Sequence, residues 1–103
     1  MTDITIEVRN TEKDDLFTTV RGVVRNNVPR TCKSLSLIAI FRDQNGDTVD
    51  KVTEQVVYDI DRSSYLERGE ARTFSIMSSS PYVDSVEMKY SASFQKNSGF
   101  VKR

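Results

Sequence analysis

The chain has 103 residues, the size of one domain, and its 15 basic and 15 acidic residues give a net charge of zero. It has no histidine and one cysteine, Cys32, which removes the commonest general base and excludes an internal disulfide or a zinc site. Residues 43–70 hold eight acidic and three basic residues, and no segment has the basic density that nucleic-acid binding requires. We therefore expect a single domain over residues 1–103 that is not an enzyme and binds no nucleic acid.

Apolar residues recur along the chain with a period of two, which is typical of half-buried β-strands. In chain order, this alternation predicts strands at residues 3–9, 16–26, 35–42, 48–58, 72–77 and 86–95. The final strand is the clearest, because every second residue from Val86 to Phe94 is apolar and the residues between them are polar. No segment carries the apolar stripe of a long helix.

Details within these strands predict local features. The polar segment 10–15 is expected to be a turn, and Gly22 in the second strand predicts a β-bulge or a close backbone approach. In the third strand, Ile38 and Ile40 point away from the main apolar face, which indicates that its second half is covered on both sides.

Six or seven short strands separated by turns predict an antiparallel, immunoglobulin-like β-sandwich, with a closed barrel as the alternative. The tail at residues 96–103 is expected either to be flexible or to add a short edge strand.

The segment DQNGD at 43–47 joins two predicted strands, and Asn45-Gly46 is a strong signal for a hairpin turn because both residues tolerate positive φ. The alternative is a calcium site formed by Asp43, Asp47 and Asp50. The spacing fits an EF-hand loop poorly, since that loop requires glycine at its sixth position and helical flanks. We predict a turn, and keep the cation site as the alternative.

Four aromatic residues lie in or near the connections: Tyr58, Tyr65, Tyr82 and Phe100. Aromatic side chains on loops can anchor a partner protein or a carbohydrate. They can also close the ends of a sandwich core, and the sequence leaves both interpretations open.

Other reactive groups favour structural roles. With no histidine to act as its base, Cys32 is expected to be an unreactive thiol in a loop or at the core edge. Paired carboxylates occur at Asp59 and Asp61 and at Glu67 and Glu70, in a polar connection where such residues usually keep a loop solvated.

Three segments match a known family in order: VRGVVRN at 20–26, FRDQNGDTV at 41–49 and LERGEARTFSI at 66–76. They resemble the FxLYD domains, small immunoglobulin-like sandwiches of bacteria and archaea, over about residues 16–94. Of the motif that names the family, only Asp43 is kept. The resemblance implies a non-catalytic module, often exported or attached to the cell surface, and supplies no catalytic residues.

The sequence thus predicts a non-catalytic interaction or structural module whose partner is a protein, or a second copy bound through an edge strand. The alternative is a sandwich that binds a divalent cation or a carbohydrate. No stretch is apolar enough to span a membrane, and the N-terminus lacks a secretory signal. The chain is therefore expected in the cytoplasm, or at the cell surface or in the periplasm if a leader was removed.

Overall fold

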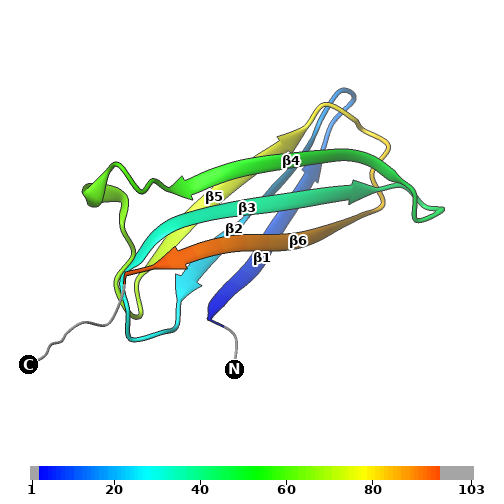
Figure 1. Cartoon of the computed structure of the whole chain (residues 1–103). Helices are drawn as coiled ribbons and strands as arrows, with labels where there is room; N and C mark the ends of the chain where they lie inside the picture. Colours follow the sequence, from blue (N-terminus) through cyan, green and yellow to red (C-terminus); the bar gives the residue numbers. More distant parts are fainter. Residues whose placement is uncertain (1–2, 96–103) are drawn as a thin grey trace, which may run out of the picture.

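The computed structural model describes residues 3–95. They form two antiparallel sheets of three strands each that face one another (Figure 1). The strands are β1 (Ile4–Lys13), β2 (Thr18–Asn26), β3 (Cys32–Arg42), β4 (Thr48–Val57), β5 (Ala71–Ser78) and β6 (Ser85–Phe94), with one 3-10 turn, η1 (Arg62–Ser64), between β4 and β5. The predicted antiparallel, immunoglobulin-like β-sandwich is confirmed.

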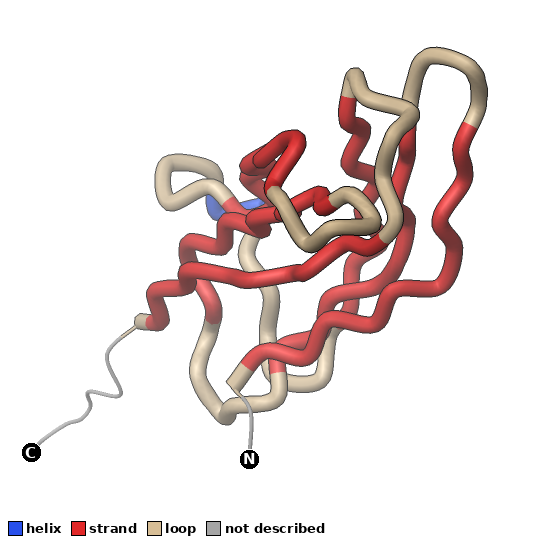
Figure 2. Tube along the Cα trace, turned by 90° about the vertical axis from the view of Figure 1, so that its right-hand side faces the viewer, coloured by secondary structure: helices blue, strands red, loops and turns tan. Residues whose placement is uncertain are grey.

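The chain crosses from one sheet to the other and back, and connections that are far apart in the sequence therefore lie at the same end of the sandwich. The first sheet has the strand order β1-β2-β5 and the second has the order β4-β3-β6. As a result, the turns 14–17 and 43–47 and the connection 79–84 lie at one end of the sandwich, which we call the turn end. The connections 27–31 and 58–70 lie at the opposite end (Figure 1), and Figure 2 looks onto the turn end.

The core lies between the sheets and is built from alternate residues. On β3, the side chains of Leu35, Leu37, Ala39 and Phe41 are fully buried, and each large one stabilises the fold by about 1.5–3 kcal/mol. Facing residues from the other strands complete the core: Ile4, Val20, Val24, Phe74 and Ile76. On the opposite face of β3, Ile40 is only 8% exposed. Ile38, the other residue predicted to be covered on this face, is half-buried, so the prediction of a second covered side is confirmed at Ile40 alone.

A β-bulge at Arg9 decides which side chains of β1 face inward. The register of β1 against β2 shifts there. Before the shift, alternate residues of the segment 4–8 pair with the buried residues of β2, and after it Thr11 and Lys13 do so. An extra residue on one strand reverses the alternation beyond it. The bulge thus turns the Lys13 side chain toward the space between the sheets.

Gly22 of β2 pairs with Val8, directly before this bulge. A Cβ atom on Gly22 would lie 2.9 Å from Cζ of Phe74 and well inside contact distance of the Glu7 carbonyl oxygen. The predicted bulge or close backbone approach is confirmed, and both occur, with the extra residue on β1.

Some strand boundaries differ from those predicted. β1 continues to Lys13, so the turn is shorter than the segment 10–15, and β2 begins at Thr18. Leu16 is consequently in the turn and 65% exposed, not on the inward face. β3 begins at Cys32, earlier than expected. Backbone pairing extends strands through residues whose side chains carry no apolar alternation.

Buried polar side chains connect strands to loops. Asn26 is fully buried at the end of β2, and its Nδ2 donates to the carbonyl oxygens of Arg30 at 2.8 Å and Leu66 at 2.9 Å. Along the side where β4 and β5 meet, Oγ of Ser78 donates to Oδ2 of Asp50 at 2.7 Å. This second bond joins the two sheets along that side.

Two further predictions concern the C-terminal tail and a membrane span. The tail at 96–103, including Phe100, lies outside the described residues. Within residues 3–95, no helix has the length and apolar character needed to cross a membrane.

Candidate functional site

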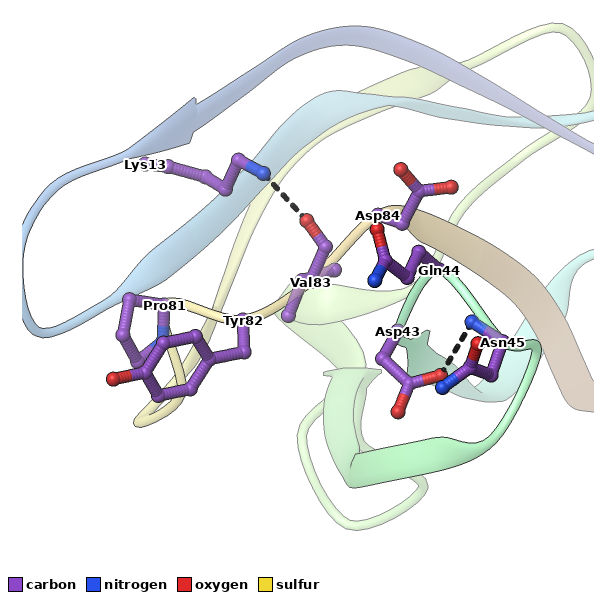
Figure 3. Close-up of a pocket in the computed structure, with 8 residues that line it drawn as sticks. All are labelled: Lys13, Asp43, Gln44, Asn45, Pro81, Tyr82, Val83 and Asp84. Carbon is purple, nitrogen blue, oxygen red and sulfur yellow. Dashed lines mark hydrogen bonds between the residues drawn. The ribbon is translucent and has the colours of Figure 1, made fainter.

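Two connections and the end of strand β1 form a cleft at the turn end, which we call the loop cleft (Figure 3). It has a volume of about 390 Å³ and is lined by Lys13, Asp43, Gln44, Asn45, Pro81, Tyr82, Val83 and Asp84. Two other hollows lie over strands β2 and β5 and beside the β1–β2 turn. The loop cleft is the stronger candidate because it gathers polar and aromatic side chains from three separate parts of the chain, as binding sites on rigid scaffolds do.

The 43–47 segment forms one wall and is a tight hairpin turn. Oδ1 of Asp43 accepts hydrogen bonds from the backbone amides of Asn45 at 2.9 Å and Asp47 at 3.1 Å. Gly46 has a φ of 85°, which favours glycine, and its amide donates to the Asp43 carbonyl at 3.0 Å. The predicted hairpin turn is confirmed, and its own hydrogen bonds account for its shape.

The three carboxylates of the alternative cation site do not gather at this turn. Asp43 caps the turn, and Asp50 on β4 instead accepts hydrogen bonds from Ser78 and from the next backbone amide. Across the described residues, no three Asp, Glu, Cys or His side chains are grouped so that they could hold a metal ion. The structure therefore gives no support to a cation site built from Asp43, Asp47 and Asp50.

The opposite wall is the 79–84 connection, which three strands hold in place. Nζ of Lys13 on β1 donates to the Val83 carbonyl at 2.6 Å (Figure 3). Oγ1 of Thr18 on β2 donates to the Ser80 carbonyl at 2.8 Å, and the Asp84 amide donates to the last carbonyl of β3 at 2.7 Å. The wall is therefore held in a fixed shape even though it lacks secondary structure.

Several groups of the loop cleft are free to contact a ligand. Tyr82 is 79% exposed, and its ring lies beside Pro81 on one side of the cleft while Asp84 and Gln44 lie on the other (Figure 3). The side chains of Asp84, Gln44 and Asn45 make no hydrogen bond to another residue of the described chain. The loop cleft thus has an aromatic ring at one side and a carboxylate and two amides at the other, on loops that are already ordered.

The other predicted partner residues lie elsewhere. Tyr65, at the opposite end, packs against the core, and its hydroxyl donates to the Asp59 carbonyl at 2.7 Å. Partial burial, together with the Asp59 carboxylate, raises the pKa of Tyr65. Tyr58 lies at the same end and is 43% exposed. The four aromatic residues therefore do not form one site: Tyr65 closes the core, Tyr82 lies at the turn end, and Phe100 is not described.

The paired carboxylates take part in local hydrogen bonds of the 58–70 connection. Oδ1 of Asp61 accepts from the amide of the second residue of η1 at 3.1 Å, and Oε1 of Glu70 accepts from the Glu67 amide at 2.6 Å. Oε1 of Glu67 accepts from Oγ1 of Thr31 at 2.6 Å. Each of these side chains shapes the connection, as short-range carboxylate bonds commonly do.

Cys32 lies in the core and not in a loop. Its side chain is fully buried, its Sγ donates to the Ser34 carbonyl at 3.3 Å, and burial raises the pKa of the thiol. A thiol of raised pKa is a poor nucleophile.

Sequence reasoning identifies Asp43 and Tyr82 but misses Lys13 and Asp84 as members of one cleft. The sequence pattern places Lys13 in a turn, and only the bulge at Arg9 directs its side chain inward. The signal available in the sequence is Gly22, which indicates a break in strand alternation nearby.

Comparison with known proteins supports the assignment of the fold and gives no information on the function. No family model and no curated protein matches the sequence, so the FxLYD resemblance is not confirmed. Among solved structures, the chain is similar to a DUF1425 family member from Shewanella sp. pv-4, with 14% identity and a TM-score of 0.63. The match covers 90% of this chain and 81% of that chain. At this identity the likeness shows the fold alone, a small β-sandwich.

Proposed function

We propose that this chain is a non-catalytic interaction module that binds another protein through the loop cleft. The observation that carries the proposal is that the Tyr82 ring is 79% exposed at one side of the cleft, while polar side chains with no hydrogen-bond partner in the described chain line the other side. Tyrosine is among the residues that dominate protein–protein binding energies, because it combines a large apolar surface with a hydroxyl.

The chemistry of the cleft indicates the kind of segment it suits. Asp84 and the Asp43 oxygen not used by the turn can accept hydrogen bonds, and the Tyr82 ring can face a cation. A partner loop that presents arginine or lysine beside an apolar residue would satisfy these groups. Because the connection is held by Lys13, Thr18 and the β3 carbonyl, binding would order little additional chain.

Two further features support a non-catalytic role. The chain contains no histidine, and the candidate nucleophile Cys32 is buried with a raised pKa. The resemblance to FxLYD domains points to the same class of module.

The test compares the full chain with Tyr82→Ala and a matched control, Tyr58→Ala, at the opposite end. Each protein is immobilised, exposed to a lysate of the source organism, and any protein retained is identified, purified and titrated by calorimetry. We expect Tyr82→Ala to weaken binding about 30-fold or more, as loss of a central aromatic does, and Tyr58→Ala to leave it unchanged. Equal binding by all three proteins would contradict the proposal. Retention of a glycan in place of a protein, lost in Tyr82→Ala, would assign the cleft to carbohydrates.

A further inference from the structure

The edges of the two sheets differ in how well they are protected against pairing with another chain. β1 carries the bulge at Arg9, and β4 and β5 lie against each other, joined by the Ser78–Asp50 hydrogen bond and by the Arg72 guanidinium bonded to the Val56 carbonyl. Bulges, covering groups and charged side chains are the usual protection of edge strands. Among the described strands, β6 is the edge without a bulge or a covering group, and its charged residues are Glu87 and Lys89.

β6 is a regular strand along its whole length. All its residues from Ser85 to Phe94 pair with β3, and the irregularity between these strands lies at Lys33, on the β3 side. It contains no proline, and no described strand pairs with its outer edge. Its backbone amides and carbonyls on that edge can therefore form a further ladder.

The side chains of β6 also leave apolar surface for a partner to cover. Its inward row runs from Val86 through Met88 and Tyr90, and these side chains are only partly buried, with Tyr90 37% exposed. On β1, Val8 is 44% exposed. β5 lies against β4, so β1 and β6 border the opposite, open side of the sandwich (Figure 1).

We propose that two copies of this chain pair through β6, antiparallel, about a two-fold axis that passes through Met88. In this register Glu87 of one copy lies opposite Lys89 of the other, twice, and Val86 lies opposite Tyr90. Opposite charges directly across a strand pair are favourable, and like charges are not. A dimer of this kind joins the two second sheets edge to edge, in the order β4-β3-β6 followed by β6-β3-β4.

Neighbouring registers lack this complementarity. An axis through Glu87 places two carboxylates opposite each other, and an axis through Lys89 places two ammonium groups opposite each other. An axis through Tyr90 places both charged residues opposite serines. The zero net charge of the chain adds no repulsion between copies.

The experiment measures the mass of the full chain by sedimentation equilibrium over about two decades of concentration. Lys89→Glu is compared with Lys51→Glu, which makes the same charge change on β4, the other edge of the same sheet. We expect a dimer of the wild-type chain, a dissociation constant about tenfold higher for Lys89→Glu, and no change for Lys51→Glu. Mixing Lys89→Glu with Glu87→Lys should restore the dimer, because opposite charges then face each other again.

A second pair of variants reports the register and does not depend on the charge variants. Glu87→Lys removes the Arg42–Glu87 ion pair at 2.9 Å, and both Glu87→Lys and Lys89→Glu remove the ion pair between Lys89 and Glu87 of the same chain at 3.9 Å. Met88→Cys should give a disulfide-linked dimer on mild oxidation, because the two thiols meet at the axis. Ser91→Cys on the same strand should not, because position 91 lies opposite position 85. A monomeric wild-type chain, equal effects of Lys89→Glu and Lys51→Glu, or equal cross-linking at positions 88 and 91 would each overturn the proposal.

Discussion

Replacing Gly22 by alanine tests whether the close approach of β1 to β2 is built into the fold. In an ordinary strand position, alanine in place of glycine stabilises by about 0.5–1 kcal/mol because it reduces the freedom of the unfolded chain. At Gly22, the new methyl group would lie 2.9 Å from Cζ of Phe74 and would overlap the Glu7 carbonyl. The phenyl ring can turn, but the carbonyl belongs to the β1 backbone and cannot.

Overpacking of this kind costs about 1–3 kcal/mol, and more where backbone must move. We therefore expect Gly22→Ala to lower the free energy of unfolding by about 2 kcal/mol. The melting temperature, measured by circular dichroism, would fall by about 8–16 °C for a domain of this size. Urea unfolding would measure the loss of free energy.

The control is Gly46→Ala, where an added methyl group would meet no other part of the chain within 4 Å but the backbone φ is +85°. This control should cost about 1–2 kcal/mol from backbone strain alone. A Gly22→Ala chain as stable as the wild type would refute the reasoning about the bulge.

Three further predictions follow from buried and paired groups. Asn26→Ala removes a fully buried amide and leaves carbonyl groups unsatisfied, so we expect a loss of about 2–4 kcal/mol in urea unfolding, and an unchanged midpoint would contradict this. Cys32 should react with a thiol reagent at pH 8 only after unfolding, since burial raises its pKa; rapid labelling of the native chain would argue against a core position. The hydrogen bond from Arg42 holds the pKa of Glu87 below its ordinary 4.5, so its stabilising effect is present above about pH 5 and is lost as the pH falls through the lowered value. Wild-type stability should therefore fall more than that of Glu87→Gln between pH 7 and pH 3, and parallel curves would show that the ion pair is not responsible.

The strands were predictable where one face of the strand is buried and the other face is exposed to solvent. The alternation in β3 and β6 survives in the structure because each inward residue faces the opposite sheet. The prediction from apolar alternation failed at the end of β1, where the hairpin extends past the core and segment 10–13 is exposed on both faces. Such residues carry no burial signal, and backbone pairing alone keeps them in the strand.

The candidate site was predictable only in part. The Asn45-Gly46 turn depends on local backbone preferences, which the sequence contains directly. The loop cleft depends on contacts over long sequence separations, such as the bond of Lys13 to the Val83 carbonyl, and on a bulge that reverses which side chains face inward. Buried polar residues such as Asn26 were missed for the same reason, since their partners come from distant loops.

The most direct test of the proposed function is hydrogen–deuterium exchange of the full chain with and without the protein retained in the capture experiment. If the loop cleft is the binding surface, amides in segments 43–47 and 79–84 should be protected by the partner, and those in segment 58–70 should be unchanged. Protection confined to segment 58–70, or none at the turn end, would contradict the account.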